Sequence, residues 1–152
     1  MAFEIERKFL VVGDDWRAAD AVFYCQGYLN RDKQRTVRVR IAGEAAFLTV
    51  KGLSVGACRS EFEYPLPLDD AQALLKLCEP PLIEKHRRVI EHAGFQWEVD
   101  SFLGLNAGLV VAEIELDAED QVFEKPDWVG EEVTGDARYF NSSLSAKPFT
   151  TW

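Results

Sequence analysis

Apolar and charged side chains alternate along most of this 152-residue chain, and this period of two constrains its fold more than any other feature. Alternate residues of a strand point to opposite faces of a sheet, so the pattern predicts strands rather than helices. Turn-rich joints separate several of the segments, which favours antiparallel neighbours. The expected strands cover residues 3–12, 23–31, 34–42, 46–53, 58–65, 82–92, 95–103 and 109–116.

Three short helices are expected between these strands. Asp14 or Asp15 can cap one that reaches Ala21, and Asp69 can cap another that ends before Pro80-Pro81. A third is expected over residues 117–123, and a further turn around residues 137–140. About eight strands with few helices predict a mainly β (α+β) fold, an eight-stranded antiparallel β-barrel with a few short flanking helices. The length and the lack of repeats or linkers indicate a single domain over residues 1–152.

One face of the expected strands consists almost entirely of charged side chains. Its acids are Glu4, Glu6, Glu61, Glu63, Glu98, Asp100, Glu113 and Glu115, and its bases are Lys8, Arg38, Arg40, Lys51, Arg59, Lys85 and Arg87. A solvated outer face is the ordinary cause of such alternation, but it would mix in Ser, Thr, Asn and Gln. Here seven strands repeat the pattern, and most carry charges of one sign. We therefore expect these side chains to face a shared, enclosed cavity.

The ligand of such a cavity has to satisfy both signs of charge. Carboxylates without His or Cys suit hard cations such as Mg²⁺ or Mn²⁺, and Arg and Lys suit phosphate oxygens. A metal–polyphosphate complex needs both. Because the chain has no Walker loop and no Rossmann glycine fingerprint, side chains rather than a helix N-terminus must hold the phosphates. The net charge of −9 argues against a general nucleic-acid binder.

Several features predict a cytoplasmic location. The first eight residues carry four charges and no apolar run, so we expect no signal peptide. No stretch approaches the roughly 20 apolar residues of a membrane span. Cys25, Cys58 and Cys78 are odd in number and form no CxxC or zinc pattern with His86 and His92, which indicates reduced thiols.

The motifs on these strands resemble those of the CYTH family, the triphosphate tunnel metalloenzymes, and most resemble its short bacterial inorganic triphosphatases. Glu4-Ile5-Glu6-Arg7-Lys8 is similar to the N-terminal ExExK signature of the family. The other motifs follow in the order that the family shows: Arg38-Val39-Arg40, Thr49-Val50-Lys51, Glu61-Phe62-Glu63, Glu84-Lys85-His86-Arg87, Trp97-Glu98-Val99-Asp100, Ala112-Glu113-Ile114-Glu115-Leu116 and the tail Tyr139-Phe140-Asn141-Ser142-Ser143-Leu144.

The resemblance implies a tunnel-shaped barrel, Mg²⁺ or Mn²⁺ as cofactor, and sometimes a homodimer. It also implies roles for the charged residues. Phosphate ligands would be Lys8, Arg38, Arg40, Lys51, Lys85 and Arg87, and metal ligands would be Glu4, Glu6, Asp100, Glu113 and Glu115. Glu61 and Glu63 would support the basic neighbours or the metal, and a water would be positioned by Glu4 or Glu6 with Lys8 or Lys85, or by a second metal. The resemblance leaves the roles of Arg59 and Glu98 open.

The expected activity is metal-dependent hydrolysis of inorganic triphosphate to pyrophosphate and phosphate. The short hairpin loops leave no evident segment for binding a base or a thiazole, which favours this small-molecule substrate. Nucleoside or thiamine triphosphate hydrolysis and class IV adenylyl cyclase activity are alternatives, and they would need a stacking platform such as Tyr24, Tyr28 or Trp16. A non-catalytic polyphosphate-binding module and a purely structural barrel are further alternatives.

Overall fold

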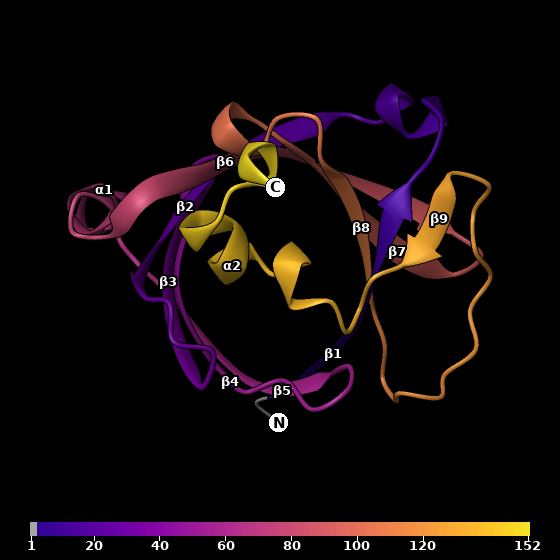
Figure 1. Cartoon of the computed structure of the whole chain (residues 1–152), viewed down its shortest axis with the longest axis horizontal. Coiled ribbons are helices and arrows are strands. Elements are labelled where there is room, and N and C mark those ends of the chain that lie inside the picture. The colour runs from indigo at the N-terminus through magenta and orange to yellow at the C-terminus, as the bar shows by residue number, and fades with distance from the viewer. Residues whose placement is uncertain (1–2) are drawn as a thin grey trace.

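The computed structural model describes residues 3–152, and its dominant feature is a ring of antiparallel strands (Figure 1). The described residues form β1 (Phe3–Val11), β2 (Ala21–Asn30), β3 (Arg35–Ala42), β4 (Ala45–Gly52), β5 (Cys58–Pro65), β6 (Glu79–His92), β7 (Phe95–Phe102), β8 (Val110–Glu115) and β9 (Val129–Glu132). Their order is β5-β4-β3-β2-β6-β7-β8-β1-β9, and a further pairing of β5 with β1 closes eight of them into a barrel. The predicted eight-stranded antiparallel barrel is therefore confirmed.

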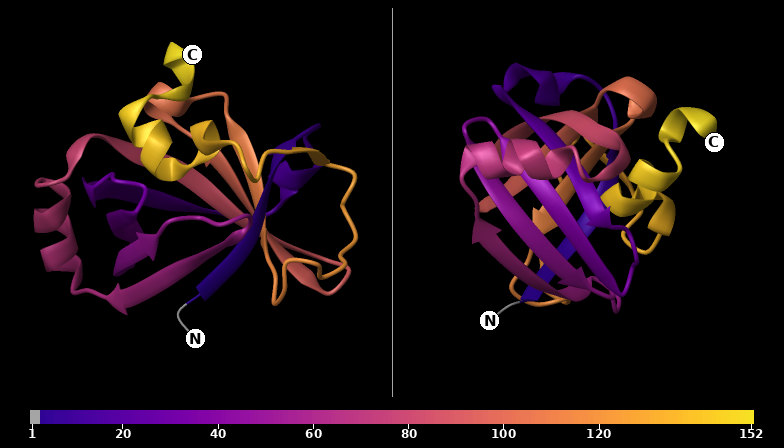
Figure 2. Two further views of the ribbon diagram at one scale, coloured as in Figure 1. Left: turned by 60° about the horizontal axis from the view of Figure 1, so that its bottom comes forward. Right: turned by 90° about the vertical axis from the view of Figure 1, so that its left-hand side faces the viewer.

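Short helical elements lie around this barrel. They are α1 (Leu68–Leu75), α2 (Asn141–Ala146) and single 3₁₀ turns at Asp15–Ala18, Gly104–Asn106, Ala137–Tyr139 and Phe149–Thr151. Figure 2 shows α1 on the outside of the strands and the C-terminal helical segment over one end of the barrel. Within residues 3–152, no helix is long and apolar enough to cross a membrane.

The predicted helix over residues 117–123 is wrong. The chain makes a turn there, closed by a hydrogen bond from the Asp117 backbone N–H to the side chain of Gln121, and then runs on without regular structure. Aromatic packing explains the path, because Phe123 and Trp128 both pack edge-on against Trp97, with ring centroids 5.7 and 5.8 Å away. Such contacts stabilise the loop without a helix.

Other elements also differ from the sequence prediction. The N-terminal helix is a single 3₁₀ turn that ends at Ala18, and β2 already begins at Ala21. The short strand β9 was not predicted; it pairs with the outer edge of β1 near Phe9 and Val11. Four residues give too few alternations to be recognised as a strand from sequence alone.

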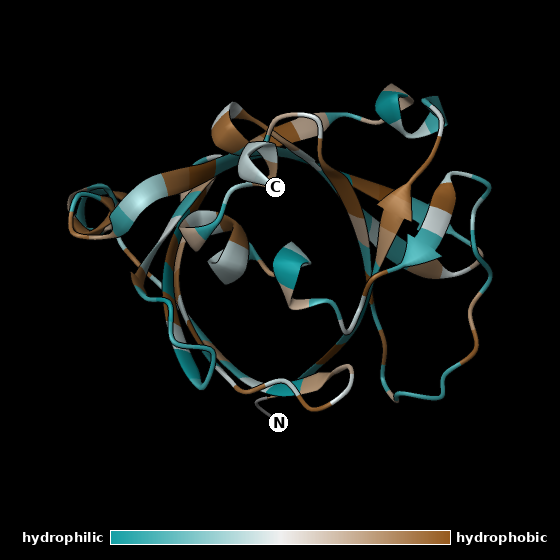
Figure 3. Cartoon of the chain, viewed as in Figure 1, coloured by the Kyte–Doolittle hydropathy of each residue, from teal (hydrophilic) through white to brown (hydrophobic). Residues whose placement is uncertain are grey.

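Most of the apolar core lies outside the ring of strands. Phe9, Trp97 and Ile114 are fully buried on the outer faces of β1, β7 and β8, beneath Trp16 and the 116–129 segment. On the opposite side, Val39 packs beneath α1. Figure 3 shows hydrophilic and hydrophobic residues alternating along the barrel strands. With the apolar residues facing outward, the alternate charged residues face the barrel interior.

A second apolar cluster closes one end of the barrel interior. Ile83, Phe102 and Val111 come from the barrel strands, and Leu144 of α2 packs against them with no exposed surface. The C-terminal segment thus seals this end and leaves a polar space behind it. The hydrophobic contact also fixes α2, whose six residues would not form a stable helix alone.

Candidate functional site

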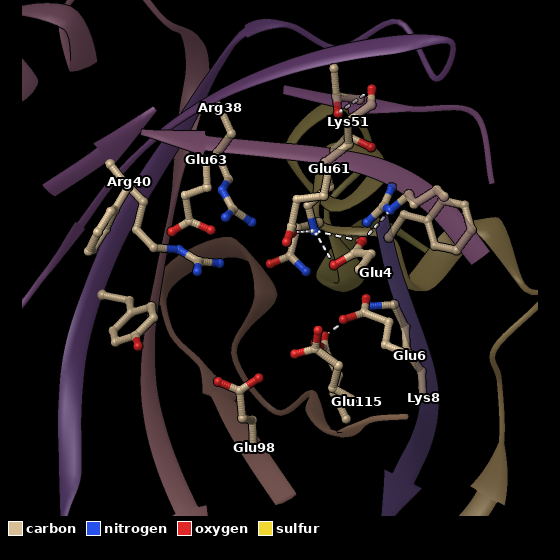
Figure 4. Close-up of a pocket in the computed structure, with 18 of the residues that line it drawn as sticks. Glu4, Glu6, Lys8, Arg38, Arg40, Lys51, Glu61, Glu63, Glu98 and Glu115 are labelled. Carbon is tan, nitrogen blue, oxygen red and sulfur yellow. Dashed lines mark hydrogen bonds and ion pairs between the residues drawn. The ribbon is translucent and has the colours of Figure 1, made fainter. Parts of the chain in front are cut away.

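A polar cavity of about 270 Å³ occupies the barrel interior, and Figure 4 shows the charged side chains that project into it. Thirteen of its lining residues are charged: Glu4, Glu6, Lys8, Arg38, Arg40, Lys51, Arg59, Glu61, Glu63, Arg87, Glu98, Glu113 and Glu115. The uncharged wall includes Tyr24, Tyr28, Phe47, Phe140 and Asn141. All predicted site residues except Lys85 and Asp100 thus line one cavity, and so do Arg59 and Glu98, whose roles the sequence leaves open.

Strand register brings acids and bases together on the β1 side of the cavity. Glu4 lies opposite Arg59 in the β1–β5 pair, and its carboxylate accepts hydrogen bonds from Arg59 and, at 2.9 Å, from Lys51. Lys8 lies opposite Glu113 in the β1–β8 pair, and Lys8 Nζ donates to that carboxylate at 2.7 Å. Burial would lower the pKa of Lys8, but the two carboxylates Glu113 and Glu6 outweigh it and raise this pKa. Lys8 is therefore held as a cation.

Lys85 and Asp100, which the sequence predicts to face the cavity, are fully buried and are not among the residues that line it. Both oxygens of Asp100 accept hydrogen bonds from Arg87, at 2.7 and 2.8 Å, and Lys85 Nζ lies 2.7 Å from Oδ2. A bidentate pair of this kind fixes the planar guanidinium. Asp100 is thus paired with both bases, and it orients Arg87 in this structure. The pKa of Lys85 is lowered to about 7, because burial and the nearby Arg87 and Arg40 outweigh Asp100.

Arg38 and Arg40, neighbours on one face of β3, differ from the other bases of the cavity. Among residues 3–152, no carboxylate lies within ion-pair distance of either guanidinium. Arg38 donates to Thr49 at 3.2 Å and its buried Nε has no partner. Arg40 donates to the Gln26 amide, and its pKa is lowered to about 10 by burial and by repulsion from Arg38 and Arg87. Two enclosed cations without a counter-ion form an anion site.

Carboxylates gather on the side of the cavity formed by β1, β7 and β8. Glu6 lies directly opposite Glu115 in the β1–β8 pair, and Glu98 lies directly opposite Glu113 in the β7–β8 pair. Like charges at such positions repel. Burial together with Glu61, Glu4 and Glu6 accordingly raises the pKa of Glu115. In Figure 4, Glu98 and Glu115 lie across the pocket from Arg38 and Arg40.

The donor chemistry of this acidic side fits a hard divalent cation. In the described part of the chain, no three His, Cys, Asp or Glu side chains already converge on one metal position. Mg²⁺ needs no such cage, because it is commonly held by one or two carboxylates, substrate phosphates and water. The facing carboxylates Glu6 and Glu115, and Glu98 and Glu113, could supply that share of the ligands. A cation there would also relieve their repulsion.

The sequence did not reveal two uncharged amides of the site. Gln26 projects from β2 and bonds to Asn141, which lines the cavity from the start of α2. The sequence prediction rests on alternating charged residues, and the inward face of β2 carries none. Asn141 stands in the recognised C-terminal motif, but a helix over the barrel end does not follow from strand periodicity.

Comparison with known proteins agrees with this geometry. The family model of the CYTH domain matches residues 2–147. An inorganic triphosphatase of Acetivibrio thermocellus is 53% identical over 151 residues, covering 98% of this chain and 97% of that protein. An inorganic triphosphatase of Nitrosomonas europaea is 36% identical, with 93% and 96% covered. The crystal structure of an inorganic triphosphatase superimposes with a TM-score of 0.65 at 35% identity, with 95% of each chain covered. The chain therefore belongs to the CYTH domain family.

Proposed function

We propose that this protein is a metal-dependent triphosphatase that hydrolyses inorganic triphosphate to pyrophosphate and phosphate. The observation that carries the proposal is the polarity of the cavity, with unpaired Arg38 and Arg40 on one side and facing carboxylates on the other. A triphosphate with its metal would satisfy both sides at once. The similarity to inorganic triphosphatases over nearly the whole chain supports the same activity.

The shape of the wall favours an inorganic substrate over an organic one. The Tyr24 ring is already covered by Arg40 and Arg87, whose guanidinium carbons lie 5.0 and 4.9 Å from its centroid. Trp16 packs in the outer core with 2% of its surface exposed, and Tyr28 is also buried. Trp16 therefore does not line the cavity, and the two tyrosines that do line it are either held against arginines (Tyr24) or largely buried (Tyr28). The compact triphosphate chain needs no stacking platform.

We assign the binding roles from the ion pairs. Arg38 and Arg40 would hold the phosphate oxygens directly, because their charges have no partner to lose. Lys8, Lys51 and Arg87 would flank the chain of phosphates while they remain paired with carboxylates. We propose that Lys85 and Asp100 act indirectly, with Asp100 fixing Arg87 and Lys85 paired to Asp100.

The carboxylates of β1, β7 and β8 would hold the metal, and Mg²⁺ or Mn²⁺ is the proposed ion. The ligands would be Glu6, Glu113 and Glu115, with Glu98 beside them and with Glu4, Glu61 and Glu63 as support. When bound, such an ion would offset the negative charge of the triphosphate. The triphosphatases of this family depend on a metal in general.

Within the chain, Glu6 is the better of the two candidates for orienting the attacking water. Glu4 already accepts hydrogen bonds from Lys51 and Arg59, whereas among the described side chains the one ion-pair partner of Glu6 is Lys8, at 3.2 Å. A carboxylate with a free lone pair can accept a proton from water as the phosphorus–oxygen bond forms. The bases around the terminal phosphate would stabilise the developing charge and the pyrophosphate that leaves.

A metal-by-substrate matrix tests the function. The purified chain is assayed with Mg²⁺, Mn²⁺ or EDTA on inorganic triphosphate, ATP and thiamine triphosphate, and both phosphate and pyrophosphate are measured. We expect one phosphate and one pyrophosphate per inorganic triphosphate, and no turnover in EDTA. Faster hydrolysis of an organic triphosphate would make that compound the substrate in place of inorganic triphosphate. Cyclic AMP formation from ATP would overturn the hydrolase assignment. Binding without turnover under every metal would indicate a polyphosphate-binding module instead.

We propose a cytoplasmic location, which the three free cysteines Cys25, Cys58 and Cys78 support. We also propose a homodimer, and light scattering coupled to gel filtration measures its mass directly. A mass near 17.2 kDa at all concentrations would exclude the dimer.

A further inference from the structure

Asn141 connects the C-terminal helix to two bases of the barrel. It begins α2, and its Oδ1 accepts hydrogen bonds from Lys85 Nζ and from Gln26 Nε2, both at 3.1 Å. The other end of the Gln26 amide, Oε1, accepts from Arg40 Nε at 2.9 Å. Two amide side chains therefore form a continuous bridge from Lys85 on β6 to Arg40 on β3.

The cations at the two ends fix the direction of both amides. Lysine and arginine can only donate, so the oxygen of Asn141 has to face Lys85, and the oxygen of Gln26 has to face Arg40. This leaves the Gln26 amino group pointing to Asn141 Oδ1, as observed. Asn141 Oδ1 is thus occupied by two donors, and the Asn141 amino group is turned away from them.

The amino group of Asn141 has no protein partner among residues 3–152, although the residue lines the charged cavity. It also does not belong to the buried polar atoms that lack a hydrogen bond, so it reaches open space in the cavity. An uncharged donor in this position can bond an oxygen of a bound anion. Arg40, one of the two bases without a carboxylate partner among residues 3–152, is linked to Asn141 by two hydrogen bonds through Gln26.

We propose that Asn141 is a substrate-contacting residue whose Nδ2 donates to a phosphate oxygen of the triphosphate, while its Oδ1 holds Lys85 and Gln26 in place. The proposal rests on the proposed function, because it names a further ligand of the same site. It gives the C-terminal helix a role in recognition as well as in closing the barrel.

The position of α2 does not depend on the side chain of Asn141. Leu144 is fully buried against the apolar end of the barrel, and Arg31 donates to Ser145 Oγ and to the backbone carbonyl of Pro80. Gln26 is itself fully buried between its neighbours. Variants at Asn141 are therefore expected to fold with α2 in place.

The Asn141→Asp variant distinguishes phosphate binding by Nδ2 from the positioning of Lys85 and Gln26 by Oδ1. Aspartate is nearly isosteric and keeps an acceptor for Lys85 and Gln26, but it replaces the free amino group by an anionic oxygen that faces the phosphates. Asn141→Ala removes both functions. The matched control is Ser143→Ala, because Ser143 lies on the same helix but lines a hollow on the outer surface instead of the cavity.

Two measurements are made on all four proteins. The first is KM and kcat for inorganic triphosphate with Mg²⁺, and the second is calorimetric affinity for inorganic triphosphate in EDTA, where no turnover is expected. A hydrogen bond to a charged group contributes enough for about a 10- to 100-fold change in affinity. We therefore expect Asn141→Asp to raise KM and Kd at least tenfold, Asn141→Ala to raise them less, and Ser143→Ala to leave both unchanged.

The outcomes also separate this proposal from the function on which it rests. If Asn141→Asp has KM and Kd within twofold of the wild type, Asn141 only positions its neighbours and the proposal is wrong. If the wild type binds triphosphate without hydrolysing it, the proposed activity fails, but the calorimetric comparison still decides the role of Asn141. Circular dichroism and thermal melting of each variant show whether a weaker affinity comes from loss of structure.

Discussion

Replacing Arg40 by methionine tests whether its charge serves a ligand or the fold. Arg40 lies on β3 beside Arg38 and Arg87, has no carboxylate partner among residues 3–152, and bonds only the neutral amide of Gln26. Methionine keeps much of the length of the side chain and removes the charge. If the charge of Arg40 binds a phosphate and contributes nothing to the stability of the empty barrel, the methionine variant should lose activity without losing stability.

The stability cost of the Arg40 charge follows from the lowered pKa of this side chain. Burial, and then repulsion from Arg38 and Arg87, moves the pKa of Arg40 from 12.5 to about 10. At about 1.4 kcal/mol per pH unit, this difference is roughly 3 kcal/mol by which the folded barrel disfavours the charge. Because the pKa of a base is lowered, the penalty is fully present at neutral pH and diminishes only as the pH rises above about 10.

Arg40→Met also removes a hydrogen bond that stabilises the fold. Without Arg40, the buried oxygen of Gln26 loses its 2.9 Å hydrogen bond, and an unpaired buried acceptor costs about 1–3 kcal/mol. The two effects nearly cancel, so we expect the unfolding free energy to stay within about 2 kcal/mol of the wild type. Removing one such charge from an active site commonly lowers kcat by ~10²–10³.

Urea unfolding with and without inorganic triphosphate, both in EDTA, measures the stability of the empty barrel and its stabilisation by the ligand. At 100 times its Kd, a ligand stabilises the native state by about 2.7 kcal/mol, and Arg40→Met should lose most of this increment. Arg35→Met is the matched control, since Arg35 lies on the same strand with 66% of its side chain exposed. A variant that loses several kcal/mol of stability in the empty state, yet keeps the ligand increment, would refute the reasoning.

Three other predictions concern the same protein. Lys51→Ala should lower kcat by about 10²–10³ in steady-state assays while the far-ultraviolet spectrum stays unchanged, because Lys51 holds Glu4 and Glu61 at the cavity wall. Chelation of divalent ions should abolish turnover, and adding back Mg²⁺ or Mn²⁺ should restore it; activity in excess EDTA would count against a metal-dependent site. The hydrogen bond from Arg7 lowers the pKa of Glu132 below 4.5, so its stabilisation is present above about pH 4.5 and is lost as the pH falls; Glu132→Gln should therefore flatten the acid side of the stability profile.

The barrel and most of its site could be predicted because both follow from the same alternation. A period of two places Arg38 and Arg40 on one face of β3 and Val39 on the other, and the structure places them in the cavity and in the core, respectively. Glu4 and Glu6 on β1 follow the same rule. Alternation fixes only the side of the sheet, however, and not the depth along the barrel. For this reason it did not show that Lys85 and Asp100 are fully buried and not exposed to the cavity.

What the sequence did not reveal depends on contacts between distant segments. The path of residues 117–128 is set by Trp97, and local helix signals such as Asp117 could not compete with that packing. The bridge from Asn141 to Gln26 joins residues 115 positions apart. Amide side chains are equally at home on a surface, so their types alone did not distinguish these two residues from solvent-facing ones.

The first strand of the chain pairs with both β5 and β8 and so closes the ring. The partners of β1 are β5, β8 and β9, and the register joins Glu6 to Glu115 and Glu4 to Arg59. During synthesis, Arg59 follows Glu4 by 55 residues and Glu113 follows Lys8 by 105 residues, so the ring cannot close before β8 has been made. Such distant pairings are slow to form. The binding chamber consequently comes into being in the closing step itself, so an incompletely folded molecule should have no partial affinity for polyanions through this strand.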